Sequence, residues 1–277
     1  MAYPVVSAPY GLKPVNLIGG QVFAGSTRLL PIQYNYGTNI FYGDFVALAR
    51  GTITRLAVTT AGGAAGMVGI FLGCTYTDPV TKNKRFSQYY PQNTLAGDIQ
   101  AYVTDDPVTV FKAVIVASSG STTVTSGAVA LIGQNLQGSD LAGNINTGDS
   151  SNGLIVPAAT TSSAYVARVV GLVSDTAASL GNVGYSSIST ATVTTASGIP
   201  FALPVGTDVS SIAPNGQLIQ SGSYVATAAS AGATSVVLNA APSIAFASGS
   251  TLVFTQFPEV LVKINFGIHE YYTATAV

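Results

Sequence analysis

The chain has 277 residues and a formal net charge of −1, and only 8% of its residues are Asp, Glu, Lys or Arg. It contains one histidine and one cysteine, so the acids, bases, nucleophiles and metal ligands that catalysis needs are scarce. This composition argues against an enzyme, and the lack of a basic field argues against direct nucleic-acid binding.

The mean hydropathy of +0.45 is high for a soluble monomer. A membrane-spanning helix needs about 18 consecutive apolar residues, and the strongest runs, 67–72 and 114–117, are far shorter. Burial between subunits remains as the explanation, because interface cores are poor in charge and rich in aromatic residues. We therefore expect no cofactor, metal or membrane partner, but contact with other protein chains.

Residues 1–27 are rich in proline and glycine. Proline fixes φ and removes a backbone donor, so we predict an extended N-terminal arm rather than a helix or a central strand. An apolar arm is expected to lie on a surface, either its own or that of a neighbouring chain. The candidate contact residues on the arm are Tyr3, Val5, Tyr10, Leu12, Val15 and Phe23.

From residue 28 onward, apolar residues alternate with polar ones or with glycine, a period of two that predicts β-strands. Strands are expected within 30–36, 40–48, 53–58, 68–76, 86–90, 99–103 and 108–116. The only basic cluster, Lys82, Lys84 and Arg85, follows a predicted turn and belongs to a hairpin. Two interpretations stay open: a solvated hairpin tip, or an ion-pairing contact with an acidic partner surface.

The second half of the chain carries few charges. Residues 118–164 are rich in Ser, Thr, Gly and Asn and predict a long loop insertion with short strands. Residues 176–258 hold one charged side chain, Asp208, and predict a small β insertion domain in which 234–238 pairs with 251–254. Asn215-Gly216 is a tight-turn signal.

The predicted fold is therefore all-β, with no helix of ten or more residues. The body is assigned to 28–117, 165–175 and 259–277, because 165–174 and 259–266 again have strand patterns and 259–266 is expected to close the body sheet.

Several single residues have structural interpretations. Cys74 falls on the apolar side of its strand together with Ile70 and Leu72, which predicts a buried thiol. His269 is placed on the polar face that holds Lys263 and Asn265, which predicts an exposed or interfacial histidine.

The neighbouring acids Asp105 and Asp106 precede Pro107. Because neighbours in a strand point to opposite faces, they form no carboxylate dyad there, and an Asx-type turn is expected. A calcium site is the less favoured alternative.

Several phrases are similar to one protein family: YGLKPVNLIGG at 10–20, IFYGDFVALARGTITRL at 40–56, GIFLGCTYTDP at 69–79, FSQYYP at 86–91, AYVTDDPVTVF at 101–111 and EVLVKINFGIHEYY at 259–272. Together they resemble head decoration (cement) proteins of tailed bacteriophages, including cyanophages. The resemblance covers roughly 10–117, 165–175 and 259–277.

This resemblance implies a small β-barrel or β-tulip-like body in a structural virion protein, made in the host cytoplasm. Such a protein is a homotrimer on the outer surface of the capsid, where it bridges major capsid protein subunits and stabilises the head. Two rival functions are a receptor- or glycan-binding head fibre or adhesin, with Tyr185 and Tyr224 stacking on sugars, and a depolymerase, for which no carboxylate pair can be nominated.

Overall fold

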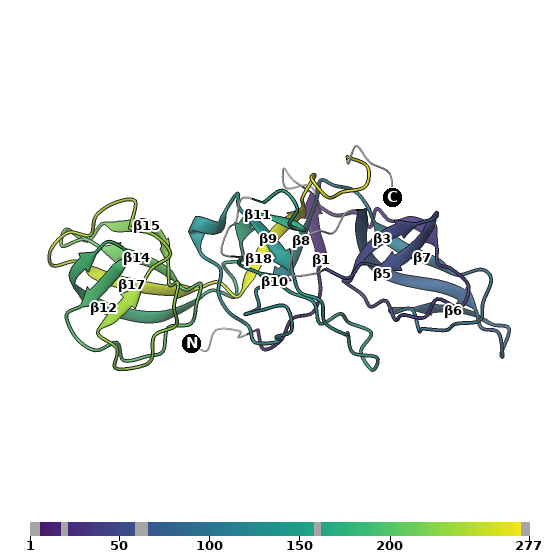
Figure 1. Ribbon diagram of the computed structural model, residues 1–277, viewed down its shortest axis with the longest axis horizontal. Helices are drawn as coiled ribbons and strands as arrows, with labels where there is room; N and C mark the ends of the chain where they lie inside the picture. The colour runs from purple at the N-terminus through teal and green to yellow at the C-terminus, as the bar shows by residue number, and fades with distance from the viewer. Residues whose placement is uncertain (1–5, 18–21, 59–65, 158–161, 273–277) are drawn as a thin grey trace. The chain divides into compact units, whose positions relative to one another are not determined.

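A computed structural model describes residues 6–17, 22–58, 66–157 and 162–272 of the chain. These residues form eighteen β-strands and one short 3₁₀-helix, η1 (Val129–Leu131), which confirms the predicted all-β fold (Figure 1). No helix among them is long and apolar enough to span a membrane.

The chain divides into two compact units. The first, here called the body, comprises Ala8–Thr122, Gly133–Val170 and Leu261–Val277. The second, here called the insertion unit, comprises Met1–Ser7, Thr123–Ile132 and Gly171–Val260. The insertion domain expected at 176–258 lies inside the second unit, whereas most of the expected loop insertion 118–164 belongs to the body.

One six-stranded sheet is built largely from body residues. Its order is β1 (Lys13–Leu17), β8 (Thr109–Val114), β18 (Glu259–Ile264), β11 (Ala167–Leu172), β9 (Asn135–Gly138) and β10 (Leu154–Ile155). In β8 every residue except Lys112 is buried, and in β18 buried and half-buried residues alternate from Val260 onward. Such burial is expected for strands inside a sheet. The predicted closing strand 259–266 is thus an interior strand.

The first strand, β1, shows where part of the predicted arm over 1–27 lies: it is extended and packs on the body's own sheet. Lys13 to Leu17 pair antiparallel with β8, and Leu12 before them is only 1% exposed. Pro14 is tolerated because β1 lies at the edge of the sheet, where a missing backbone donor costs least. At least residues 12–17 therefore belong to the fold of the body itself.

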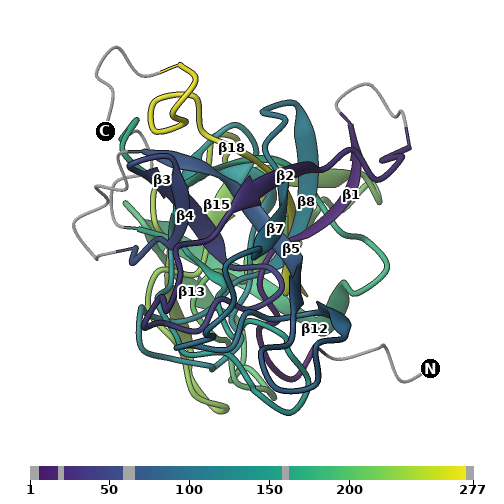
Figure 2. The same ribbon diagram turned by 90° about the vertical axis from the view of Figure 1, so that its right-hand side faces the viewer.

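The second body sheet curls into a small barrel. Its strands follow the order β2 (Arg28–Pro31), β7 (Gln100–Thr104), β5 (Met67–Thr77), β3 (Phe45–Ala49) and β4 (Thr52–Arg55), and β6 (Lys84–Ser87) pairs with β5. Figure 2 shows β3 and β4 side by side. A parallel bridge between Ile32 and Ile53 joins the β2 end to β4, so the sheet closes on itself.

The barrel is filled by buried apolar side chains. Its core consists of Ile32, Ile40, Val46, Ile53, Val68, Phe71, Cys74, Tyr76, Tyr90, Ala96, Ile99, Ala101 and Val103. Their burial removes apolar surface from water, at roughly 25 cal/mol for each Å². This core holds β5 and β7 in place, and those strands carry the surface described below.

The insertion unit contains the third sheet. Its order is β15 (Leu218–Tyr224), β14 (Asp208–Ile212), β17 (Thr251–Gln256), β12 (Ala178–Ser189), β13 (Thr192–Thr195) and β16 (Ser235–Val237), several of which are labelled in Figure 1. An isolated antiparallel bridge pairs Val225 with Leu238, the residues that directly follow β15 and β16, the two outer strands of this sheet. The predicted Asn215-Gly216 turn is confirmed, because the Gly216 N–H donates to the Ala213 carbonyl at 2.8 Å.

The predicted pairing of 234–238 with 251–254 is wrong. β16 pairs with β13, whereas β17 pairs with β12 on one side and β14 on the other. The central position of β17 follows from its burial, because Leu252 and Phe254 are fully enclosed in the core of this unit. The short β16 lies instead at an edge.

Candidate interaction surface

The β5–β6 hairpin projects a tight turn whose geometry is set by Asp78. Its carboxylate accepts backbone N–H bonds from Val80 and Thr81 at 2.9 and 3.0 Å and an ion pair from Arg85 at 3.1 Å. The two backbone bonds, with a smaller contribution from Arg85, lower the pKa of Asp78. Lys82 follows with a φ of +59°, a left-handed conformation that turns the chain back.

Large apolar side chains are exposed on this hairpin together with its cations. Val80 is 86% exposed and Phe86 is 74% exposed, and both lie next to the exposed Lys82 and Lys84. β6 pairs only with β5 among the described strands. Charged residues on such a strand hinder unspecific edge-to-edge pairing, whereas clustered exposed apolar groups mark a contact surface.

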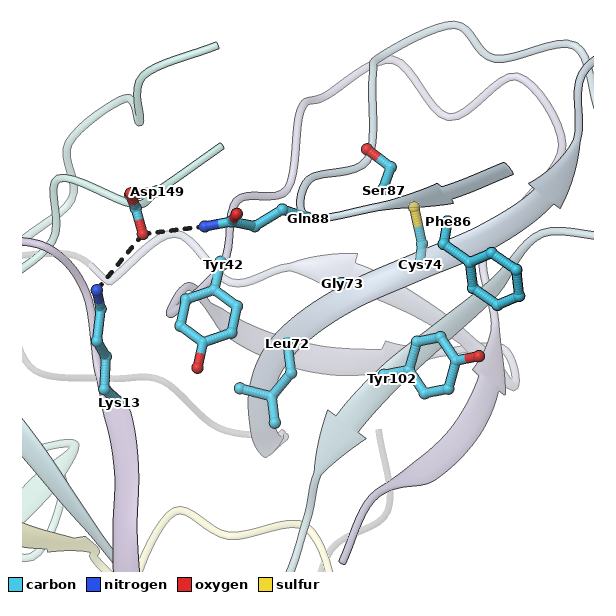
Figure 3. Close-up of a pocket in the computed structure, with 10 residues that line it drawn as sticks. All are labelled: Lys13, Tyr42, Leu72, Gly73, Cys74, Phe86, Ser87, Gln88, Tyr102 and Asp149. Atoms are coloured by element: carbon cyan, nitrogen blue, oxygen red, sulfur yellow. Dashed lines mark hydrogen bonds and ion pairs between the residues drawn. The ribbon is translucent and has the colours of Figure 1, made fainter. Parts of the chain in front are cut away.

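Beside the hairpin the surface of the body is hollowed (Figure 3). The hollow has a volume of about 560 Å³ and is lined by Lys13, Tyr42, Leu72, Gly73, Cys74, Phe86, Ser87, Gln88, Tyr102 and Asp149. β5, β6, β7 and β1 supply most of these residues. Segments distant in sequence thus meet at one open depression.

A β-bulge in β5 shapes the floor of this hollow. The register of β5 against β7 shifts between Phe71 and Gly73, and Gly73 has a φ of +133°. A Cβ on Gly73 would lie 2.9 Å from the Ser87 carbonyl oxygen, so glycine permits the close approach of β6. The extra residue, Leu72, is half-buried and lines the hollow.

The same bulge corrects the predicted surroundings of Cys74. Its burial is confirmed, with 1% exposure, but it packs in the barrel core with Phe71 and Tyr76 rather than beside Leu72. The bulge inserts one residue and so reverses the alternation of faces beyond it. Burial raises the pKa of the Cys74 thiol to about 12.

Asp149 connects the polar side chains at one end of the hollow. Its Oδ1 accepts a hydrogen bond from Gln88 Nε2 at 3.1 Å and lies 3.6 Å from Lys13 Nζ. Burial, and secondarily the charge of Asp149, raises the pKa of Tyr42. Lys13 also lies over the ring of Tyr10, at 4.8 Å from its centroid. The negative charge of Asp149 and the positive charge of Lys13 cancel, so this end of the hollow has no net charge.

The predicted contact residues of the arm are only partly at this surface. Tyr3 and Val5 lie outside the described residues. Tyr10 and Phe23 are half-buried, Val15 is 44% exposed, and Leu12 lies in the interior. The predicted basic residues Lys82, Lys84 and Arg85 do lie on one hairpin, as expected.

Sequence reasoning missed the hollow and the exposed pair Val80 and Phe86. The strand pattern assigned Phe86 to a strand but gave no sign that its ring faces solvent. The signal that would have found it is the short length of β6 next to a basic cluster, which is typical of an edge strand.

His269 is not on an exposed polar face. It is 0% exposed, because β18 ends at Ile264 and the chain then turns, which interrupts the alternation with Lys263 and Asn265. Its Nε2 lies 3.2 Å from the Asp105 carbonyl oxygen, and its Nδ1 accepts the Tyr271 N–H at 3.3 Å. Burial lowers the pKa of His269.

Asp105 and Asp106 make different structural contacts. The predicted Asx-type turn is confirmed for Asp106, whose Oδ1 accepts the Val108 N–H at 2.9 Å. Asp105 Oδ2 instead accepts the Tyr271 hydroxyl at 2.6 Å and pairs with Arg28 Nε at 3.0 Å. Both acids therefore have structural partners.

In the insertion unit, the aromatic residues expected to stack on sugars are partly covered. Tyr185 packs edge-on against Phe246, with ring centroids 5.4 Å apart. Tyr224 is half-buried, and burial raises the pKa of its hydroxyl. Neither ring presents a free face comparable to that of Phe86.

Acidic, cysteine and histidine side chains are scattered. Among the residues that the structure describes, no three of them lie close enough together to hold a metal ion. Comparisons of the chain with protein-family models, curated proteins and solved structures find no match.

Proposed function

We propose that this chain is a structural virion protein, a head decoration (cement) protein that binds the outside of a tailed-phage capsid and bridges neighbouring major capsid protein subunits. The β5–β6 hairpin is the observation that carries the proposal, because it places exposed apolar and cationic side chains together on its turn and on the edge strand β6. The phrases that resemble decoration proteins cover most of β5, at 69–79, and the end of β6, at 86–91, and so flank the turn of this hairpin.

The chain would stabilise the capsid by binding to it, not by catalysing a reaction. Val80 and Phe86 supply apolar contact area that becomes buried against the shell, and interface cores favour such residues. Lys82 and Lys84 are exposed and form no salt bridge within the part of the chain that the structure describes, so they are available to orient the chain on an acidic shell surface. The outer edge of β6 offers main-chain hydrogen bonds to an extended partner segment.

The test is cosedimentation with shells assembled from the major capsid protein of the same phage, before and after expansion. The wild-type chain is expected to pellet with expanded shells. The variant Lys82→Glu/Lys84→Glu/Phe86→Ser is expected to bind at least about tenfold more weakly, through lost apolar contact and reversed charge. Tyr34→Ser, at another exposed aromatic residue of the body, is the matched control and should bind normally.

Two results would refute the proposal. In the first, the wild-type chain stays in the supernatant with both kinds of shell. In the second, the hairpin variant decorates shells as fully as wild type does.

A homotrimer is part of the proposal. Light scattering on the purified chain is expected to give about three times the chain mass of 28.0 kDa. A monomeric mass for protein that still decorates shells would refute the trimer while leaving the capsid role intact.

A further inference from the structure

The hollow beside the hairpin has two chemically different ends (Figure 3). Phe86 and Tyr102 stand at one end, Lys13, Gln88, Asp149 and Tyr42 occupy the other, and Leu72 lies between the two tyrosines. Binding sites for small molecules combine apolar and aromatic walls with a few placed polar groups. The volume of about 560 Å³ lies within the usual range for such sites.

Several polar atoms at the hollow are unused. Within the described residues, no hydrogen bond is made by the Tyr42 or Tyr102 hydroxyl, by Gln88 Oε1 or by Asp149 Oδ2. The raised pKa of Tyr42 keeps its hydroxyl protonated at neutral pH, so it remains a donor. The hollow therefore offers both donors and acceptors to a ligand.

The charges at the hollow favour no ion. Asp149 lies between Lys13, with which it forms an ion pair, and the neutral Gln88, from which it accepts a hydrogen bond (Figure 3). An anion would meet the Asp149 carboxylate, and a cation would meet Lys13. A neutral ligand with many hydroxyl groups uses all the polar atoms without this penalty.

We propose that this hollow binds a neutral saccharide. One pyranose ring lays its apolar face against Tyr102, with Phe86 as the outer wall, and its hydroxyls turn towards Tyr42, Gln88 and Asp149. Aromatic rings provide flat apolar surfaces of this kind. Because the hollow is open rather than enclosed, it accepts a residue within a longer glycan chain. The site lies on the body, not on the insertion unit where sugar stacking was expected. It shares Phe86 with the proposed capsid contact, but its test on the free chain does not depend on the capsid role.

The test uses the full chain and four neutral disaccharides: maltose, cellobiose, lactose and N,N′-diacetylchitobiose. Amide shifts of the ¹⁵N-labelled chain are followed while each sugar is titrated to millimolar concentrations. At least one sugar is expected to give saturable shifts at residues 72–73, 87–88 and 102. Tyr102→Ala should weaken that binding about tenfold by removing the stacking face.

Tyr42→Phe keeps the ring and removes only the hydroxyl, so it should weaken binding about fivefold while leaving the fold intact. Tyr34→Ala is the matched control, because Tyr34 is 59% exposed and does not line the hollow. The proposal is overturned if none of the four sugars shifts these residues. It is also overturned if Tyr102→Ala and Tyr42→Phe bind as tightly as the control does.

Discussion

Ser150 donates a 2.6 Å hydrogen bond to the carboxylate of Asp44, although 106 positions separate the two residues in the sequence. Asp44 is 0% exposed and also accepts bonds from Asn152 Nδ2, the Phe41 N–H and Arg55 Nε. Burial raises the pKa of Asp44, and the bonds from Ser150, Phe41 and Arg55 oppose that rise. One carboxylate therefore fastens the segment around 150 to the β3–β4 hairpin.

Replacing this carboxylate is expected to destabilise the body. Asp44→Ala leaves several buried donors unpaired, including the partly buried Arg55, and breaking such a network costs about 3 kcal/mol or more. The free energy of unfolding in urea measures it. Asp175→Ala, at an exposed acid, is the control and should change this free energy by less than about 0.5 kcal/mol. If both variants lose the same free energy of unfolding, the Asp44 network does not stabilise the body.

His269 makes the stability depend on pH in the acidic range. Its folded-state pKa is lowered by burial, which the hydrogen bond to the Asp105 carbonyl and then the charges of Asp105, Asp106 and Glu270 partly oppose. The unfolded chain, with a histidine pKa of about 6.5, therefore takes up the proton first, and stability falls as pH drops below that value. The free energy of unfolding is measured about one pH unit above and about one unit below this unfolded-state pKa. Between the two conditions, His269→Gln should lose less free energy of unfolding than the wild type. Identical losses would contradict this account.

Cys74 is expected to be inert while the chain is folded. Its thiol is buried, its pKa is raised to about 12, and Sγ lies 3.6 Å from the Tyr89 carbonyl oxygen. Because the thiolate is the reactive form, iodoacetamide should label the thiol only after denaturation. In Cys74→Ala/Phe86→Cys the new thiol is exposed and should react at once. Rapid labelling of folded wild-type protein would show that the barrel core opens.

Asp208 is the one acid enclosed in the insertion unit among 176–258. It is 3% exposed, and its carboxylate accepts the Val129 N–H at 3.0 Å and the Ser210 hydroxyl at 3.2 Å. Burial raises the pKa of Asp208, so stability falls as pH rises from the unfolded value of about 3.9 through the folded value.

Asp208→Asn keeps an acceptor for Val129 and removes the buried charge, so it should be at least as stable as wild type at neutral pH. Asp208→Ala leaves the Val129 donor unpaired and should lose about 1–2 kcal/mol. Thermal unfolding at neutral pH compares the two variants. An Asn variant as unstable as the Ala variant would mean that the charge itself is required.

The N-terminal region offers a fifth prediction. An arm over 1–27 would predict that deletion of 1–20 spares the fold, but this deletion removes β1 and the buried Leu12. We therefore expect it to destabilise the body by about 3 kcal/mol or more. Deletion of 1–7 retains both and should leave the body's free energy of unfolding unchanged. Urea unfolding of the two truncated chains measures the difference, and equal stability would show that β1 is dispensable.

Local patterns predicted the strands with strong alternation or continuous apolar runs, such as Met67–Thr77 and Thr109–Val114. They missed β12, the longest of the described strands, because Ser, Gly and Asn interrupt its apolar pattern. The bulge at Gly73 and the turn after Ile264 reversed or ended alternations that the sequence alone would extend. The closure of the barrel through Ile32 and Ile53 is a long-range pairing that no local signal specifies.

The candidate surface was predictable only in part, for the same reason. The basic cluster on the hairpin followed from turn residues and strand spacing. The hollow required Lys13, Tyr42 and Asp149 to meet from three distant segments. The exposure of Phe86 accompanies the position of β6, which has no second neighbour among the described strands.

The capsid role is tested most directly by a reconstruction of the phage particle at a resolution that traces strands. The account predicts density for this chain on the outer surface of the expanded head, with the β5–β6 hairpin against major capsid protein subunits and copies grouped in threes. Particles that contain the chain only inside the head or in the tail, or with the hairpin pointing to solvent, would contradict it.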